Sequence, residues 1–333
     1  MTIRRTILVL LLLLLPACGT AAGSERLTIY SGRSQDLVEP LLERFHEASG
    51  IPIDVRYGDS GDLALLIANE GDRSPADVFF SQSPGTVGFL ASNDLLSTLP
   101  DAALERVAPR YRHAEGRWVG VTGRQRVLVY NADLVDEADL PDSVLDVTDG
   151  RYAGRVAVAP SNASFQDFVT AMRQHLGEDE ALEWLQAMAA NDAPVYANNN
   201  AIVEAVGRGE VEMGLVNHYY NERFLAEDPS RPSRNHSFAD GDIGALVIEA
   251  SVSVLASTDQ PEDAQRFVEY LLTDEAQRYF ASETFEYPLV DGIEPATDLP
   301  PLPSLDPPEV DVDALGPTFA DTVELIDRSG IDG

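Results

Sequence analysis

Short apolar runs alternate with segments in which apolar residues recur every three or four positions, from residue 27 to about residue 290. The first three runs are LTIYSG (27–32), IPIDVRYGD (51–59) and ADVFFSQ (76–82), and each predicts a strand. Between them, SQDLVEPLLERFHEASG (34–50) and GDLALLIANEG (61–71) have the spacing of amphipathic helices. This β-α-β-α-β order is typical of a parallel sheet with right-handed crossovers.

The same alternation continues in the second half of the chain. The predicted strands are GVTGRQRVLVYN (120–131), RVAVAP (155–160), PVYAN (194–198), VEMGLVNHYY (211–220) and GALVIEASVSVLAS (244–257). The predicted helices are 164–177, 179–191, 200–209, 261–272 and 317–330. The simplest architecture for a chain of 333 residues with this order of elements is an α/β protein of two lobes.

The predicted strands end in polar residues of an unusual kind. Ligands of open parallel sheets bind at the carboxyl ends of the strands. These ends read SGRS (31–34), SQSPG (81–85), SNAS (161–164), NNN (198–200) and NHYY (217–220). They carry hydroxyls, amides, one guanidinium and two phenols, and almost no acids, although the chain holds 56 Asp and Glu residues.

The two adjacent tyrosines, Tyr219 and Tyr220, raise a specific question about geometry. Neighbouring side chains of a regular strand point to opposite faces. Either one phenol is buried and the other exposed, or the strand ends there and both phenols converge. The pattern alone leaves both alternatives open.

The first residues indicate export. Residues 1–17 have a basic start, an apolar core and then small residues, which predicts a signal peptide rather than a spanning helix. Cys18 is the only cysteine, and it ends a sequence that resembles a bacterial lipobox, so we expect it to be lipidated. The alternative is an ordinary signal peptide with an incidental cysteine. Residues 18–26 would form the tether, and the protein would work outside the cytoplasm, anchored to the membrane.

The charge balance excludes nucleic acid as a partner. The formal net charge is −33 at pH 7, and removal of residues 1–17, which hold two arginines and no acid, makes it −35. No G-x-S-x-G, Walker or H-E-x-x-H motif occurs, so we predict no enzyme activity. The function classes that stay open are a receptor for a small ligand and, less favoured, an extracellular hydrolase.

Several motifs in register resemble the ferric-iron-binding proteins, the extracytoplasmic receptors of bacterial iron ABC transporters. They are YSGRSQDLVEPLLERF, GDRSPADVFFSQ, RWVGVTGRQRVLVYN, YANNNAIVEAVGRGEV, LVNHYYNERF, GALV and FEYPLV, and the resemblance runs in register from about residue 27 to about residue 295. The resemblance implies a bilobal periplasmic-binding-protein fold of type II, with two mixed or parallel sheet lobes and a two-segment hinge. It also implies that Tyr219 and Tyr220 bind Fe³⁺ through phenolate oxygens.

The remaining site residues are carried over from the same resemblance. Ser34 and Gln82 stand where some relatives have a histidine and a glutamate ligand, and Asn162 lies in the loop where others supply a third tyrosine. A synergistic anion (carbonate, phosphate or citrate) is therefore expected to complete the site. Its expected contacts are Arg33, Ser34, Gln82, Arg124, Asn162, Ala163, Ser164, Asn199 and Asn217, whereas Arg126 is predicted to be structural.

The resemblance also implies a domain division and a set of partners. We expect an N-terminal lobe of residues 27–124 plus 248–298 and a C-terminal lobe of residues 125–247 plus 299–333. The expected partners are the permease and the ATPase of an iron importer, and the protein is expected to be a monomer.

Overall fold

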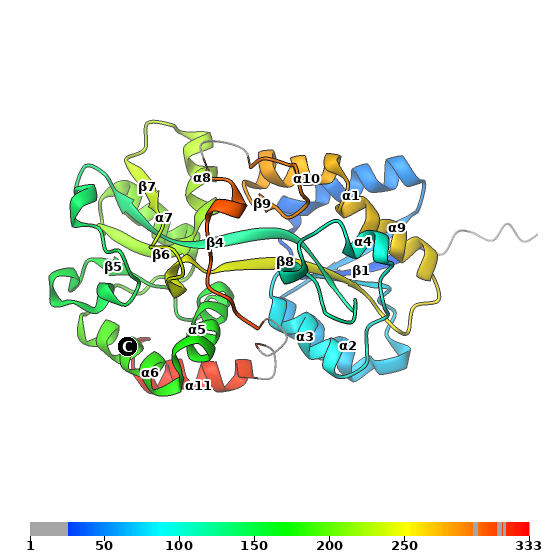
Figure 1. Cartoon of the computed structure of the whole chain (residues 1–333), viewed down its shortest axis with the longest axis horizontal. Helices are drawn as coiled ribbons and strands as arrows, with labels where there is room; N and C mark the ends of the chain where they lie inside the picture. The colour runs from blue at the N-terminus through cyan, green and yellow to red at the C-terminus, as the bar shows by residue number, and fades with distance from the viewer. Residues whose placement is uncertain (1–25, 296–298, 312–314, 316–317, 333) are drawn as a thin grey trace, which may run out of the picture.

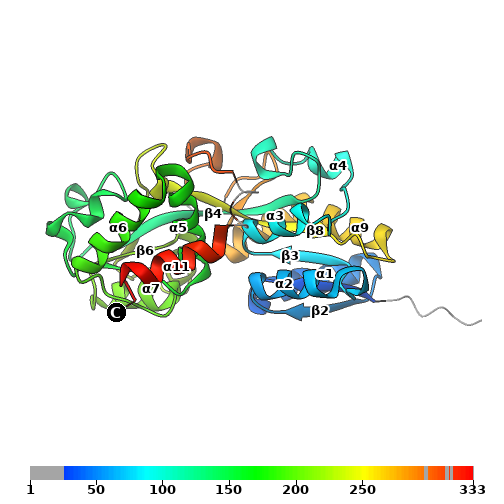
Figure 2. The same cartoon turned by 90° about the horizontal axis from the view of Figure 1, so that it is seen from below.

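The structure is a computed structural model that describes residues 26–295, 299–311, 315 and 318–332. Two α/β lobes lie side by side, and the long strands β4 and β8 run from one lobe into the other (Figures 1 and 2). The predicted signal peptide and Cys18 lie outside the described residues. No helix in the described ranges is both long and apolar enough to cross a membrane.

The N-terminal lobe is built on the predicted parallel unit. Strand β1 pairs in parallel with β2 and β3, with Ile29 opposite both Val55 and Val78, and β8 then pairs antiparallel with β3. The strands are β1 (Leu27–Ser31), β2 (Ile53–Tyr57), β3 (Val78–Ser81), β8 (Val247–Val254) and the short β9 (Tyr287–Pro288). The helices are α1 (Gln35–Ser49), α2 (Ser60–Glu70), α3 (Pro84–Ser92), α4 (Asp101–Leu104), α9 (Pro261–Leu271) and α10 (Asp274–Tyr279).

The C-terminal lobe has a smaller mixed sheet. Strand β6 pairs antiparallel with β4 and in parallel with β5, and β7 pairs with β4 on its other side. The strands are β5 (Val156–Ala157), β6 (Met213–Asn217) and β7 (Ser233–His236). The helices are α5 (Ala163–Leu176), α6 (Glu178–Ala190), α7 (Asn199–Arg208), α8 (His218–Glu227) and α11 (Phe319–Ser329).

Strand β4 (Val119–Asn131) changes partners along its length. Its first part, as far as Gln125, pairs with β8, and its second part, from Arg126, pairs with β6. Separate apolar cores lie on the two sides, one around Phe45 and Phe267 and the other around Phe168 and Trp184. The fold is therefore the predicted bilobal α/β fold. The exact lobe boundaries remain our proposal, which the change of pairing at residue 125 supports.

Two strand predictions are wrong. The run at 194–198 contributes only an isolated bridge between Val195 and Val158, because the chain turns there to enter α7. The strand that leads to the two tyrosines ends at Asn217, and α8 begins at the next residue. Both phenols therefore lie in the first turn of a helix.

Candidate functional site

The tyrosines face each other where β6 gives way to α8. The rings of Tyr219 and Tyr220 are stacked, with centroids 4.2 Å apart and planes inclined by 29°. Tyr219 is buried and Tyr220 is half-buried. Burial, followed by the neighbouring Tyr220, raises the pKa of Tyr219 well above its ordinary value, and Arg124 opposes this rise. At neutral pH Tyr219 is thus a neutral phenol, and a metal must displace its proton to bind.

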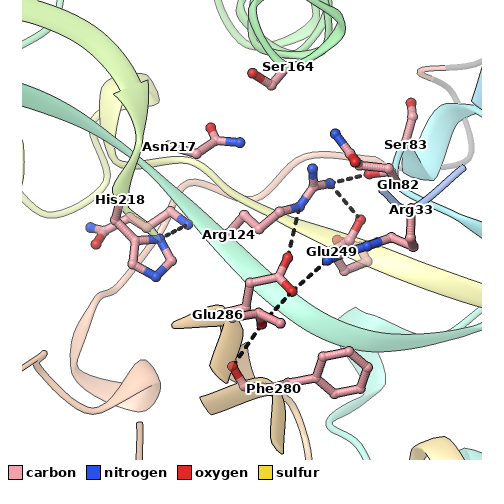
Figure 3. Close-up of polar contacts among 12 residues, drawn as sticks. Arg33, Gln82, Ser83, Arg124, Ser164, Asn217, His218, Glu249, Phe280 and Glu286 are labelled. Atoms are coloured by element: carbon pink, nitrogen blue, oxygen red, sulfur yellow. Dashed lines mark hydrogen bonds and ion pairs between the residues drawn. The ribbon is translucent and has the colours of Figure 1, made fainter. Parts of the chain in front are cut away.

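A buried group of three charged side chains, here called the cation cluster, lies at the junction of the lobes (Figure 3). Arg33 donates from Nη2 to Glu286 Oε2 at 2.6 Å, and Arg124 Nε lies 4.0 Å from Glu286 Oε1. Thr284 Oγ1 also donates to Glu286 at 3.0 Å. Burial alone would raise the pKa of Glu286, but Arg33, Arg124 and Thr284 together lower it. The cluster therefore holds two cations and one anion, a net positive charge.

The guanidinium groups of the cluster keep unused donors. Arg124 donates from Nη2 to the carbonyl oxygens of Gln82 and Glu249, the latter at 3.3 Å. In the described part of the chain, Arg33 Nε and Nη1 and Arg124 Nε have no hydrogen-bond partner, although all three are buried. Donors of this kind suit a small oxyanion, because charge-assisted hydrogen bonds to anions are short and strong.

Gly32 shapes the turn that carries Arg33. A Cβ atom at this position would lie 1.9 Å from Ser60 Oγ, so only glycine fits. Ser60 Oγ in turn accepts a hydrogen bond from the backbone N–H of Gln82 at 3.0 Å. The close approach of these turns is what brings Gln82 next to Arg124.

Three polar side chains of the C-terminal lobe form a second group, here called the amide cluster. Asn162 caps α5 and accepts from Ser164 N at 3.2 Å and from Ser164 Oγ at 2.6 Å. Asn199 Nδ2 donates to Asn162 Oδ1 at 3.0 Å and to Ser164 Oγ at 2.9 Å. The cluster joins the N-termini of α5 and α7, whose backbone N–H groups favour anions.

His218 is held in one protonation state by its neighbours. The backbone N–H of Gln125 donates to Nδ1 at 3.1 Å, and Nε2 lies 2.8 Å from the carbonyl oxygen of Phe285. Since Nδ1 must accept and Nε2 must donate, the ring is a neutral imidazole with its proton on Nε2. Burial is the main cause that lowers the pKa of His218 to about 4. His218 therefore has no free lone pair for a metal.

The two lobes touch across a cleft beside these groups. Ser83, which precedes α3, donates from Oγ to Asp167 Oδ1 on α5 at 2.8 Å. Burial is the main cause that raises the pKa of Asp167 to about 6. The adjoining cavity of about 560 Å³ is lined from both lobes, including Gln82, Ala163 and Asp167.

The predicted anion contacts fall into different environments. Arg33 and Arg124 join the cation cluster, Asn162, Ser164 and Asn199 join the amide cluster, and Gln82 and Ala163 line the cavity. Asn217 is buried and accepts from Arg126 Nη1 at 3.4 Å. Ser34 is exposed and starts α1 without a side-chain hydrogen bond.

Sequence reasoning missed two residues of this region. Glu286 lies within the FEYPLV motif, but no sequence pattern marks it as the partner of the arginines. Asp167 carries no signal because its partner Ser83 is 84 positions away. Among the described residues, no group of three or more His, Cys, Asp or Glu side chains could hold a metal.

Comparison with known proteins agrees with the sequence resemblance. The family described as "Bacterial extracellular solute-binding protein" matches residues 73–310. The "Fe(3+)-binding periplasmic protein" of Serratia marcescens is 32% identical over 314 residues, which cover 93% of this chain and 92% of that protein.

Solved structures show the same relationship. Iron-bound HitA from Pseudomonas aeruginosa superposes with a TM-score of 0.86 at 36% identity, covering 92% of this chain and 99% of that one. Trichodesmium IdiA (FutA) in complex with iron and citrate superposes with a TM-score of 0.80 at 27% identity, covering 92% of this chain and 99% of that one. The chain belongs to the bacterial extracellular solute-binding proteins, within the group that contains these ferric-iron-binding proteins, and is a binding protein and not an enzyme.

Proposed function

We propose that this protein binds Fe³⁺ outside the cytoplasm, together with a small oxyanion, and delivers it to an ABC importer. The observation that carries the proposal is the stacked pair Tyr219–Tyr220 beside a buried cluster with net positive charge. The relatives include the Fe(3+)-binding periplasmic protein of Serratia marcescens, and one solved neighbour is in complex with iron and citrate.

The phenols suit ferric iron by their chemistry. Fe³⁺ is a small, hard cation and prefers anionic oxygen over thiolate or imidazole. Loss of both phenol protons would provide two such oxygens, with Tyr219 and Tyr220 as the metal ligands. Ser34 is exposed at the start of α1, and Gln82 carries no charge, so neither replaces a strong third ligand.

An external oxyanion would supply the remaining negative oxygens. We assign it to the free donors of Arg33 and Arg124, with the amide cluster, Asn217 and the N-terminus of α5 at Ala163 opposite. Carbonate, phosphate and citrate all have the required chemistry. The presence of citrate beside iron in the Trichodesmium neighbour supports this class of anion.

Delivery and anchoring complete the proposal. Solute-binding proteins of this family serve ABC transporters, so the partners would be the permease and the ATPase of an iron importer. Lipidation of Cys18 would tether the protein, as a monomer, at the outer face of the membrane.

A spectral titration tests the proposal. Ferric salt is added to the metal-free protein in buffers with and without bicarbonate, phosphate or citrate. We expect a red or purple complex at one iron per protein that forms fully only with one of the anions. A protein that binds iron without colour, or not at all under any of these conditions, would overturn the proposal, and a receptor for another small ligand would take its place.

A further inference from the structure

His218, the first residue of α8, is held by the opposite lobe. Figure 3 shows it just beyond the arrowhead of β6. Its Nε2 donates to the carbonyl oxygen of Phe285 at 2.8 Å, and its Nδ1 accepts from the backbone N–H of Gln125 at 3.1 Å. Phe285 lies two residues before β9 in the N-terminal lobe, and Gln125 is the last residue of β4 that pairs with β8. One fully buried imidazole therefore ties the tyrosine-bearing helix to both the hinge strand and the N-terminal lobe.

The start of α8 lacks the usual helix cap. Asn217 precedes the helix in an extended conformation, but among the described residues its side chain makes no capping hydrogen bond. The first N–H groups of a helix have no partner within the helix, so an uncapped start tends to fray. Asn235 of β7 donates from Nδ2 to the carbonyl oxygen of His218 at 3.0 Å. Both the side chain and the backbone of His218 thus restrain the turn that carries Tyr219 and Tyr220.

Ring contacts follow the same route between the lobes. The centroid of the His218 ring lies 4.7 Å from that of Tyr287 in β9, with planes inclined by 38°. It lies 6.0 Å from that of Tyr219, with planes inclined by 81°. A continuous set of contacts therefore leads from the N-terminal lobe through His218 to Tyr219.

The segment that holds His218 has an unusual backbone conformation. It begins with a π-helical turn, Phe280–Thr284, a rare element that is frequent at functional sites. Phe285 follows with φ 59° and ψ 23°, in the left-handed region that bulky side chains rarely adopt. The next residue is Glu286, whose carboxylate is shared by the arginines of the cation cluster. The bend thus presents the carbonyl group of Phe285 to His218 and the carboxylate of Glu286 to the arginines.

We propose that His218 is a positioning residue, which holds Tyr219 in a fixed place relative to the cation cluster through its hydrogen bond to Phe285. The inference rests on the proposed function, in which Tyr219 is a ligand of iron. His218 does not bind the metal, because both of its ring nitrogens are already used. Residues that orient metal ligands in this way commonly change metal affinity about 10- to 100-fold when they are replaced.

This role differs from a purely structural one in what it predicts for the iron site. A histidine that served only the fold would lower the free energy of unfolding when replaced, and the folded variant would bind iron as the wild type does. A positioning residue affects the geometry of the bound tyrosine as well. The charge-transfer band of the complex and the rate of iron loss report that geometry.

The first test compares His218→Gln with His218→Asn. The amide nitrogen of glutamine reaches about as far as Nε2 and keeps a donor for Phe285, whereas asparagine keeps only an acceptor for Gln125. Iron loss to excess EDTA is followed in the presence of the effective anion, and unfolding of the metal-free proteins is measured separately. We expect the Asn variant to lose iron at least about tenfold faster, with a shifted band, and the Gln variant to stay within about threefold of wild type.

A second pair of variants tests the bend at Phe285. Phe285→Asn and Phe285→Val both remove the ring, but asparagine tolerates the left-handed conformation and β-branched valine does not. We expect the Val variant to lose iron faster than the Asn variant, because only valine displaces the carbonyl group that accepts from His218. This pair also serves if His218→Asn does not fold.

Hydrogen exchange of the metal-free protein gives a readout without iron. The N–H groups in the second turn of α8 bond to the carbonyl groups of the first turn. They should exchange faster in His218→Asn than in His218→Gln. A folded His218→Asn variant with the iron-loss rate and the band of wild type would overturn the inference and leave the proposed function intact. Absence of a coloured complex in the wild type would instead refute the proposed function, and the inference with it.

Discussion

The two sides of the cleft differ in how their charges are arranged. The N-terminal side holds the cation cluster, in which Arg33 and Arg124 share Glu286 and are largely fixed (Figure 3). The C-terminal side presents uncharged polar groups, the phenols of Tyr219 and Tyr220 and the amide cluster, together with the buried charged residues Arg126 and Asp167. The positive charges of the arginines belong to the chain itself. The negative charges that would balance a ferric ion would arise only when the ion and its anion bind.

This difference would let one site be stable without iron and still bind it, as proposed above. Buried carboxylates facing one another would repel in the metal-free state. The buried phenol of Tyr219 stays protonated and neutral, because burial raises its pKa well above the ordinary value. The arginine charges are therefore always present, whereas the tyrosine oxygens would become anionic only when iron binds.

Removal of the phenol oxygens should have the largest effect. Tyr219→Phe and Tyr220→Phe each delete a metal ligand and leave the ring packing in place. We expect each to abolish coloured iron binding at neutral pH, with little change in unfolding. Spectral titration and denaturation of the metal-free variants check this. The assignment fails if the double variant still holds one iron per protein.

Removal of the internal counter-ion should damage the fold. Glu286→Gln keeps the shape of the side chain but leaves Arg33 and Arg124 without an anion. Breaking a buried pair in this way typically costs about 3–5 kcal/mol. Urea unfolding measures the loss. Thr284→Val removes the hydroxyl that lies 3.0 Å from Glu286 Oε2 and 2.8 Å from the carbonyl oxygen of Phe280, but it removes no charge. It is the matched control and should cost about 1 kcal/mol. Equal losses in the two variants would contradict the charge argument.

The contact between the lobes should depend on pH through Asp167. Its pKa in the folded chain is about 6, against an ordinary 3.8, so the folded form binds the proton more tightly. The contribution of Asp167 to the stability of the folded protein is therefore greatest below pH 4 and is lost as the pH rises through 6. Asp167→Asn keeps an acceptor for Ser83 and should stabilise the metal-free protein by up to about 3 kcal/mol at pH 7.5.

The same variant should show no advantage at pH 4, where the wild-type carboxyl is protonated. Unfolding curves at the two pH values give the comparison. Ser83→Ala removes the bond but keeps the carboxyl, and it should lower stability at pH 7.5. A constant difference between Asp167→Asn and wild type at both pH values would show that Asp167 does not titrate as described.

The smallest effect is expected at the anion contacts. Arg124→Ala removes one guanidinium of the cation cluster and leaves both phenols. Iron affinity should fall at least tenfold, which is about 1.4 kcal/mol. The titration uses buffer free of bicarbonate, phosphate and citrate, to which each anion is then added. If the wild type and the variant bind iron equally well, and if none of the three anions changes this binding, the proposal of a synergistic anion is wrong.

The regular elements were predictable because they follow simple periodicities. The unit from β1 to β3 matches the alternation of short apolar runs with helices such as α1, whose buried residues repeat at the expected spacing. Helix α3 was missed because it is apolar on most sides and lacks an amphipathic pattern. The start of α8 was missed because an apolar strand runs directly into the helix at Asn217, without a turn.

From the sequence, the candidate site residues could be named, but the contacts between them could not be predicted. The resemblance identified Tyr219, Tyr220, Arg33 and Arg124 from motifs. The ion pair of Arg33 with Glu286 joins positions 253 residues apart, and no local pattern encodes it.

The central claim is that bound iron is held by tyrosine oxygens beside the buried cation cluster. Resonance Raman spectroscopy of the iron-loaded protein, excited within its visible band, reports the iron ligands directly. The account predicts enhanced ring and C–O vibrations of coordinated tyrosinate in wild type, and their loss in the Tyr219→Phe, Tyr220→Phe double variant. An iron-loaded wild-type protein that shows no tyrosinate vibrations would contradict it.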